Sequence, residues 1–417
     1  MAYETTRTMQ SGADGEHIAP APRVSVQAFC ETVETAAAAQ AAGEDRRLGK
    51  AHLKIQMGGI AAAVEAYRTA ATPNVIIIET ESRNDDILTG LDTLAEVCDS
   101  GTRVIVIGRQ NDVLLYRELT RRGVSEYLIS PVGTLDVVRA VCGLFSAPDA
   151  KPVGRIIAVV GAKGGVGAST IAHNIAWAIG RDLQLDTVVA DLDLGFGTAG
   201  LDFNQDPPQG IADAVFSPDR IDTNFVDRLL SKCTDHLSLL AAPATLERAY
   251  DFGTEAFDGI FDALRATMPC VVLDVPHQWN GWTQRALVSA DDILIVAEPD
   301  LANLRNAKNL FDYLRTARLN DHRPFYCLNR VNVPKRPEIR PGEFAKTLEA
   351  DPVAIIPFEP QLFGTAANNG QMIAEVSAKH KNAEIFLQLA QLLTGRSEVK
   401  KGKSGLLTPL LGKLLKK

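Results

Sequence analysis

A glycine-rich loop follows a run of apolar residues near the middle of the chain. The strand pattern RIIAVVG ends at Gly161, the loop GAKGGVGAST occupies residues 161–170, and the helical pattern IAHNIAWAIG follows at once. In this order, the backbone N–H groups of a loop and the amino end of a helix can surround a phosphate group. Gly164, Gly165 and Gly167 allow the backbone to turn tightly against the anion. The sequence therefore predicts a phosphate-binding loop.

The loop departs from the usual pattern, GxxxxGK followed by Ser or Thr. Ala168 occupies the position of the usual lysine, and Ala162 that of the leading glycine. Lys163 precedes the glycine pair, and Ser169 and Thr170 stand where a hydroxyl group would meet Mg²⁺. Loss of one such cation commonly costs about 3 kcal/mol of transition-state stabilisation, or about a hundredfold in rate. The sequence thus favours nucleotide binding and leaves hydrolysis open.

Further polar residues stand at the predicted carboxyl ends of other strands. Asp191 and Asp193 lie at the end of TVVADLD, Asp274 near the end of CVVLDVP, and Asn329 with Arg330 near the end of FYCLNRV. Ligands of open α/β sheets bind at the carboxyl ends of the strands, so these side chains are expected to meet the loop. A structural role stays open for each of them, as a loop carboxylate, a helix cap or a turn residue.

The loop, with its early lysine, resembles the deviant Walker A loop of the MinD/ParA ATPases. The segments VVADLDLGF, CVVLDVP, FYCLNRV and IPFEPQLFGTAANNGQMI continue the resemblance in the same order. It implies ATP and Mg²⁺ as cofactors, and a homodimer that encloses the nucleotides, in which Lys163 reaches the phosphates of the partner. The site residues that it implies are Gly161, Ala162, Lys163, Gly164, Gly165, Val166, Gly167, Ala168, Ser169, Thr170, Asn329 and Arg330 for the nucleotide, Ser169, Asp191 and Asp274 for the metal ion, and Asp193 and Lys163 for catalysis.

Strand and helix patterns alternate along two separate stretches, which predicts an α/β protein with two doubly wound parallel-sheet domains. The predicted parts are a flexible arm (1–21), a first domain (22–146), a linker (147–154), the P-loop domain (155–395) and a tail (396–417).

The first domain resembles the receiver domain of response regulators, through PNVIIIETES, RVIVIG and LTRRGVSEYLISPV. The residues for phosphotransfer are missing. Glu79 replaces the phosphoacceptor aspartate, Ser130 stands where a lysine would precede Pro131, and Gln27, Ala28 and Phe29 lie where an acidic pair is needed. We therefore expect a flavodoxin-like docking or localisation module that does not accept a phosphoryl group.

Charge is distributed unevenly along the chain. The whole chain carries 43 basic and 51 acidic residues, a net charge of -8, while residues 396–417 carry seven basic residues and one acid, or +6, which leaves -14 for the rest. An acidic body makes DNA an unlikely partner. The tail KKGKSGLLTPLLGKLLKK could contact an anionic membrane surface, a partner protein or neither. The six scattered cysteines are expected to be reduced core residues in a cytoplasmic protein.

A degenerate receiver domain joined to a P-loop domain with KGGVGAST resembles the TadZ/CpaE proteins of the tight-adherence (Flp type IVb) pilus system. This implies an ATPase-like localisation factor that acts with the pilus secretion machinery at a cell pole, peripheral to the inner membrane, with ATP binding as a dimerisation switch. Two other functions stay open: a ParA-like DNA-partitioning or MinD-like membrane-positioning ATPase, and a phosphorelay regulator with an ATPase output.

Overall fold

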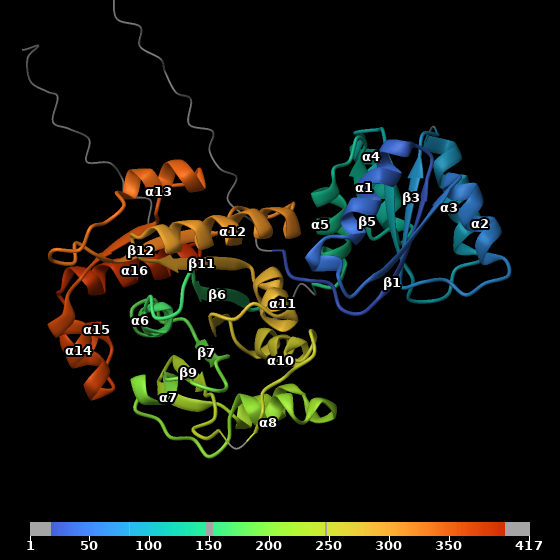
Figure 1. Ribbon diagram of the computed structural model, residues 1–417. Coiled ribbons are helices and arrows are strands. Elements are labelled where there is room, and N and C mark those ends of the chain that lie inside the picture. The colour runs from blue at the N-terminus through green and yellow to red at the C-terminus, as the bar shows by residue number, and fades with distance from the viewer. Residues whose placement is uncertain (1–17, 83, 147–152, 247, 397–417) are drawn as a thin grey trace, which may run out of the picture.

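The computed structural model describes residues 18–82, 84–146, 153–246 and 248–396. Most of the predicted arm and linker, and the basic tail from residue 397, lie outside these ranges. Two α/β domains stand side by side, the smaller before the larger in the chain (Figure 1). The predicted fold class is confirmed. No helix in the described part of the chain is long and apolar enough to cross a membrane.

The smaller domain is a five-stranded parallel sheet in the order β2-β1-β3-β4-β5. Its strands are β1 (Ser25–Cys30), β2 (His52–Met57), β3 (Val75–Thr80), β4 (Arg103–Gly108) and β5 (Glu126–Ile129). Its helices are α1 (Val33–Gly43), the 3₁₀ helix η1 (Arg46–Leu48), α2 (Gly59–Tyr67), α3 (Asn84–Ala95), α4 (Val113–Arg121) and α5 (Thr134–Leu144). Apolar clusters cover both faces of the sheet, as expected for a parallel sheet with helices on both sides.

The larger domain has an eight-stranded sheet in the order β13-β12-β11-β6-β10-β7-β9-β8. Its strands are β6 (Arg155–Gly161), β7 (Thr187–Asp191), β8 (Ser231–Thr234), β9 (Leu237–Leu240), β10 (Cys270–Val275), β11 (Asp292–Ala297), β12 (Phe325–Val331) and β13 (Ala354–Pro357). Seven are parallel, and the edge strand β8, which the sequence did not predict, pairs antiparallel with β9. The chief helices around the site are α6 (Ala168–Arg181), α7 (Ala199–Asp202), α10 (Asp258–Thr267), α11 (Gly281–Ser289), α12 (Leu301–Ala317), α14 (Pro360–Asn369) and α16 (Lys381–Leu393).

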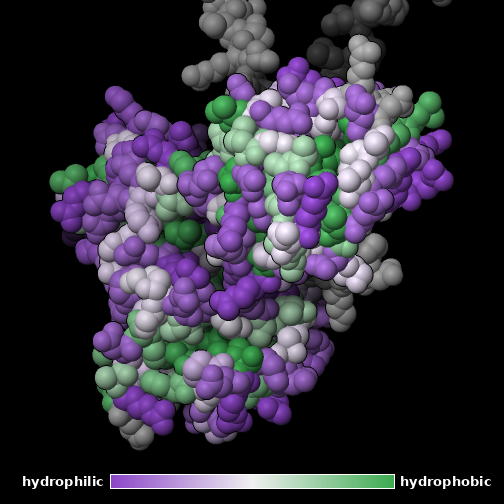
Figure 2. All heavy atoms as spheres, turned by 90° about the vertical axis from the view of Figure 1, so that its right-hand side faces the viewer, coloured by the Kyte–Doolittle hydropathy of each residue, from purple (hydrophilic) through white to green (hydrophobic). Residues whose placement is uncertain are grey.

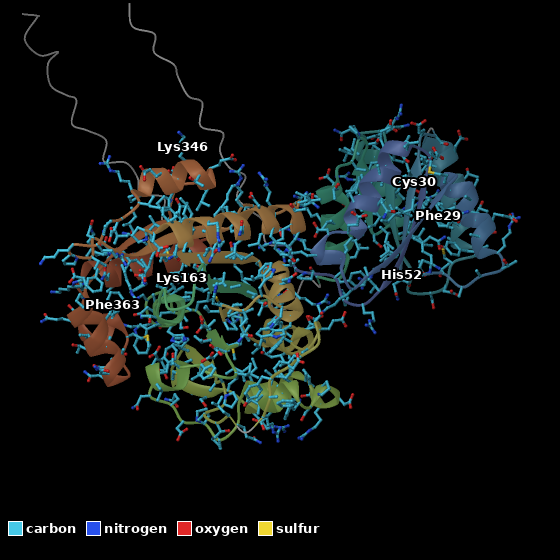
Figure 3. The ribbon with its side chains drawn as sticks, in the orientation of Figure 1. Phe29, Cys30, His52, Lys163, Lys346 and Phe363 are labelled. Carbon is cyan, nitrogen blue, oxygen red and sulfur yellow. The ribbon has the colours of Figure 1, made fainter. Side chains whose placement is uncertain are left out.

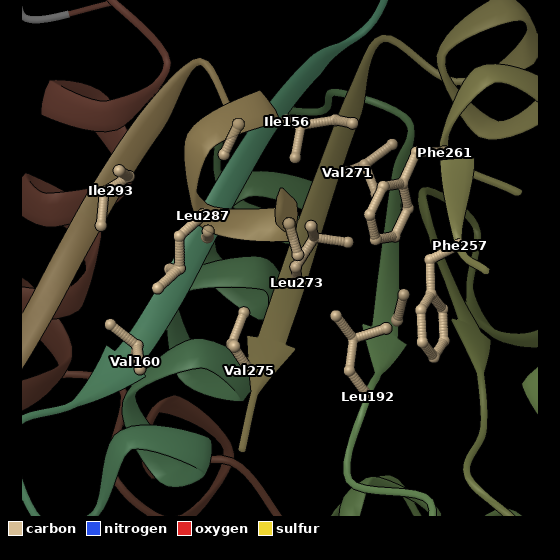
Figure 4. Close-up of a cluster of buried hydrophobic side chains, with 14 of the residues drawn as sticks. Ile156, Val160, Leu192, Phe257, Phe261, Val271, Leu273, Val275, Leu287 and Ile293 are labelled. Carbon is tan, nitrogen blue, oxygen red and sulfur yellow. The ribbon is translucent and has the colours of Figure 1, made fainter. Parts of the chain in front are cut away.

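Alternate residues of each central strand enter opposite halves of the core. Ile156 and Val160 of β6 pack with Leu273 of β10 and Phe261 of α10 on one face (Figure 4). Ile157 and its neighbours pack against α6 and α16 on the other. This period of two holds the central strands in register, so their carboxyl ends reach one edge of the sheet.

The cysteines are all free, as predicted, but two of them are not core residues. Cys98 and Cys233 are half-buried, whereas the other four are buried.

On the face shown in Figure 2, hydrophilic residues are interspersed with smaller hydrophobic areas.

The two domains are joined by a buried ionic network at the amino-terminal edge of the larger sheet. Arg46 of η1 lies 3.2 Å from Asp291, which precedes β11, and 2.6 Å from Asp321, which follows α12. Arg47 also pairs with Asp321, and Lys50 pairs with Asp262. The side chains of Arg46, Asp291 and Asp321 are between 5% and 9% exposed. The smaller domain is therefore docked at the edge opposite the phosphate-binding loop.

Candidate nucleotide site

The predicted phosphate loop joins β6 to α6, at the carboxyl edge of the larger sheet. Gly165 and Gly167 have φ values of +81° and +85°, a left-handed conformation that favours glycine. A Cβ atom on Gly167 would lie 2.7 Å from Nδ2 of Asn329, whereas a Cβ on Gly165 would meet no atom within 4 Å. Gly167 thus permits contact with β12, and the space beside Gly165 is open.

Ser169 and Thr170 lie in the first turn of α6, directly after the loop. Four N–H groups at the start of a helix lack intrahelical partners, and the helix dipole adds partial positive charge there. Lys163 lies in the loop with its Nζ atom 3.9 Å from Oδ2 of Asp300, and the two side chains are 53% and 40% exposed. Such an exposed ion pair is weak, so the lysine can leave it at little cost.

Asp191 and Asp274 are direct neighbours across β7 and β10. They are 0% and 3% exposed, respectively. The two oxygens of Asp191 accept hydrogen bonds from the N–H groups of Asp193 and Ala199, each at 3.1 Å. Burial, and then the charge of Asp274, raise the pKa of Asp191 to about 7. The structure thus brings together two carboxyl groups that the sequence placed at separate strand ends.

His173 is a site residue that the sequence analysis missed. It lies in α6 with no exposed surface, and its Nδ1 atom is 2.7 Å from Oδ2 of Asp202. Its Nε2 atom is 3.3 Å from Oδ2 of Asp274, outside hydrogen-bond geometry, so this contact is an ion pair. Burial opposes protonation, but Asp202 and Asp274 outweigh it and raise the pKa of His173 to about 10. The imidazolium therefore balances buried negative charge behind the phosphate loop.

A cavity of about 290 Å³ opens beside the loop. Its lining includes Gly167, Thr170, Asn329 and Arg330, together with residues 357–360, 363, 364 and 367. Part of the segment IPFEPQLFGTAANNGQMI therefore lines a cavity beside the phosphate loop. Figure 3 shows Lys163 of the phosphate loop and Phe363 of this segment in the larger domain. Both lie well apart from the labelled Phe29 and Cys30 of the smaller domain.

Asn329 and Arg330 reach this cavity in different ways. Nδ2 of Asn329 donates a hydrogen bond of 2.8 Å to the carbonyl oxygen of Val166 in the loop. Arg330 has a left-handed backbone (φ +50°), and its guanidinium group lies 3.0 Å from Glu298. A left-handed non-glycine residue costs on the order of 1 kcal/mol, which the surrounding structure must offset.

Asp193, which the resemblance implies for catalysis, bonds to Asp191 through its backbone N–H group and not through its carboxylate. It is half-buried in the loop after β7, and its Oδ1 atom accepts a hydrogen bond of 3.1 Å from the N–H group of Phe196. Phe196 itself is 77% exposed. The side chain of Asp193 is thus engaged with its own loop.

In the smaller domain, Glu79 at the end of β3 accepts four hydrogen bonds. The donors are the N–H groups of Glu31 and Thr32, each at 2.8 Å, and the hydroxyl groups of Thr32, at 2.7 Å, and Thr35, at 2.6 Å. Glu79 is 2% exposed. Burial alone would raise its pKa, but these donors outweigh burial and lower it. The carboxylate is therefore saturated by donors from the loop after β1 and the first turn of α1.

Three comparisons relate this chain to known proteins. Residues 154–324 match a family described as an AAA domain. The pilus assembly protein CpaE from Caulobacter crescentus CB15 is 46% identical over 31% of this chain and 99% of that solved chain, with a TM-score of 0.30. A ParA family ATPase from Chlorobium tepidum TLS is 23% identical over 58% of this chain and 98% of that chain, with a TM-score of 0.51. The septum site-determining protein MinD from Synechocystis sp. is 27% identical over 161 residues, 38% of this chain and 59% of that protein, so less than two thirds of the curated relative is matched.

The fold and the site together define a class of proteins in which a receiver-like domain is followed along the chain by a MinD/ParA-like P-loop domain. The likeness to the ParA family ATPase supports the fold of the larger domain. The sequence identity to CpaE extends over nearly all of that solved chain, and this identity, rather than the superposition, carries the more specific assignment. The chain belongs to the CpaE family of pilus assembly proteins.

Proposed function

We propose that this protein is an ATPase-like localisation and assembly factor for a tight-adherence pilus secretion system, in which ATP binding drives dimerisation with weak or no hydrolysis. The observation that carries the proposal is the phosphate loop itself, which keeps Lys163 and the glycines but has Ala168 in place of the usual lysine. Family membership supplies the pilus context. We expect the protein to act in the cytoplasm, at a cell pole.

Nucleotide binding is supported by the open space beside Gly165, the free N–H groups at the start of α6 and the adjoining cavity of about 290 Å³. In this arrangement the loop would hold the phosphates, and the cavity lined by Asn329 and Arg330 would hold the base. Hydrolysis would lack one cation at the phosphates, which predicts slow turnover.

Mg²⁺ is the metal ion that this class of site implies. In the described part of the chain, no three His, Cys, Asp or Glu side chains are arranged to hold a metal ion. Mg²⁺ at phosphate sites commonly takes one or two protein oxygens and completes its shell with phosphate oxygens and water. The hydroxyl of Ser169 and the carboxylates of Asp274 and Asp191 fit this kind of site, and the ion would supply charge neutralisation.

A homodimer is supported by exposed apolar side chains around the loop. Phe196, Leu301 and Trp279 are 77%, 73% and 52% exposed, respectively. They lie in the loop after β7, at the start of α12 and in the loop after β10, next to residues of the candidate site. A second copy could cover them while Lys163 of each copy reaches the other's phosphates.

We also infer that the smaller domain docks a component of the pilus machinery without accepting a phosphoryl group. Glu79 cannot act as a nucleophile while four donors hold its carboxylate. Labelling by a small phosphodonor would contradict this inference.

A MinD-like membrane-positioning ATPase is the second candidate, favoured by the basic, leucine-rich tail, which lies outside the described residues. A ParA-like function on DNA is disfavoured by the charge of -14 on the rest of the chain. Sedimentation with anionic vesicles would support the membrane function, and salt-sensitive retention on DNA the partitioning function.

The decisive experiment measures ATP binding, turnover and mass of the full chain with and without Mg²⁺. We expect binding and dimerisation with little turnover. Lys163→Ala should lose the dimer, and Asp274→Ala should weaken the dependence on Mg²⁺. Lys232→Ala is the matched control, because Lys232 is 68% exposed and, within the described part of the chain, pairs only with a neighbouring turn residue, Asp235. Absence of ATP binding would refute the nucleotide-switch proposal.

A further inference from the structure

Three side chains from three different elements hold carbonyl groups of the phosphate loop. Nδ1 of His277, in the loop after β10, lies 3.0 Å from the carbonyl oxygen of Gly161. Nδ2 of Asn306, in α12, donates a 2.9 Å hydrogen bond to the carbonyl oxygen of Ala162. The third donor is the Asn329 amide already described. Since a carbonyl oxygen only accepts, His277 must carry a proton on Nδ1.

These bonds matter because a loop that offers its N–H groups to an anion must turn its carbonyl groups elsewhere. Each backbone carbonyl that leaves water needs a donor. Here the carbonyl groups of residues 161, 162 and 166 accept hydrogen bonds from side chains that lie outside the loop. The N–H group of Ala162 is itself bonded to β11, through Val296 at 2.8 Å. The start and the end of the loop are therefore both anchored.

We propose that His277 and Asn306 are positioning residues that, together with Asn329, keep the phosphate loop in its binding shape without the usual P-loop lysine. The proposal rests on the proposed nucleotide binding and goes beyond it, because it assigns a role to residues outside the predicted site. Where a lysine is present, its charge attracts the phosphates directly. In this chain, preorganisation of the backbone dipoles carries more of the binding.

Asn309 supplies a matched control within the same helix. Like His277 and Asn306, it lines a cavity of about 420 Å³, which Gly161 and Ala162 of the loop also line. It is exposed, and among the described residues no hydrogen bond joins its side chain to the loop. Asn309→Ala therefore removes the same chemical group from the same cavity without removing a contact to the loop.

The first measurement is amide hydrogen exchange of residues 161–167 in the nucleotide-free full chain. A neutral hydrogen bond contributes about 1 kcal/mol, so Asn306→Ala and His277→Ala should each speed exchange in the loop about 5-fold relative to Asn309→Ala. His277→Asn should restore slow exchange, because the amide of asparagine can place a donor near the position of Nδ1. Equal exchange in Asn306→Ala, Asn309→Ala and the unmodified protein would overturn the proposal.

The second measurement is the affinity for a fluorescent ATP analogue. Asn306→Ala and His277→Ala should weaken binding about 5-fold, with His277→Asn close to the unmodified protein. Faster loop exchange in a protein that binds no nucleotide would support the positioning role and refute the proposed function. Normal binding and normal exchange in both alanine variants would refute the positioning role and leave the proposed function standing.

Discussion

Replacement of Arg46 by alanine should uncouple the two domains. The network around it contains four arginines and three aspartates, namely Arg46, Arg47, Arg265 and Arg318 with Asp45, Asp291 and Asp321. Removal of one partner from a buried ion pair costs about 3 to 5 kcal/mol. Arg265 and Arg318 remain 2.9 Å from Asp291 and Asp321, respectively, and still neutralise them. We therefore expect the low end, about 3 kcal/mol of docking free energy.

The distribution of tryptophan makes this loss measurable in urea. All three tryptophans, Trp177, Trp279 and Trp282, lie in the larger domain. Their fluorescence follows that domain alone, whereas far-UV circular dichroism follows both. In the unmodified protein the two transitions should coincide, because the buried ion pairs couple the domains, and coincidence of two probes is the mark of one cooperative transition. In Arg46→Ala the transitions should separate.

Arg68→Ala is the control for this experiment. Arg68 pairs with Glu65 in the same domain, and the two side chains are 59% and 75% exposed. Loss of such a surface pair should cost less than about 1 kcal/mol and leave the transitions together. If Arg46→Ala behaved like Arg68→Ala, the network would not hold the domains, and the reasoning from burial would be refuted.

Other predictions concern buried charges and the two left-handed glycines of the phosphate loop. His173→Gln should cost about 3 kcal/mol of unfolding free energy in urea, since Asp274 loses its cation; a loss below 1 kcal/mol would contradict this. Glu79→Gln should cost about 2 kcal/mol of unfolding free energy at pH 7, because the NH₂ group of the new amide would face N–H and O–H groups that are themselves donors. The lowered pKa of Glu79 means that its stabilisation is present above about pH 4.5 and is lost as the pH falls, so this variant should flatten the acid side of the stability profile. Gly165→Ala should cost about 1 kcal/mol for its backbone alone, and Gly167→Ala more, as seen by thermal unfolding, because its Cβ would meet Asn329.

Much of the fold was predictable because the strands are apolar runs bounded by turn residues. VIIIET of β3 and CVVLDV of β10 are buried along their whole length, and their shortness and β-branched residues favour strands. The strand β8, SKCT, has no such pattern. Its four residues become a strand only by pairing with β9, a tertiary contact that local sequence does not encode.

The site was predictable where it depends on topology and unpredictable where it depends on side-chain pairing. Asp191 and Asp274 meet because parallel strands end at one edge of the sheet. His173 stands four residues after Ser169, on the same face of α6, and this spacing was the available signal. A histidine among apolar helix residues more often fills a core, so its contacts with Asp202 and Asp274 needed the packed structure. The same holds for Arg46, since its partners lie more than 200 residues away in the chain.

The docking of the smaller domain constrains the shape of any dimer that forms over the nucleotide. Arg46 binds the amino-terminal edge of the larger sheet, at Asp291 before β11, whereas the phosphate loop follows the carboxyl end of β6. These strands are adjacent and parallel, so the two sites lie at opposite ends of the sheet. A dimer that buries Phe196 and Trp279 at the phosphate end would therefore carry its receiver-like domains on its outer ends. Under the proposed function, such a dimer would present two copies of the smaller domain to the pilus machinery, and ATP would control their number in one assembly without altering either domain.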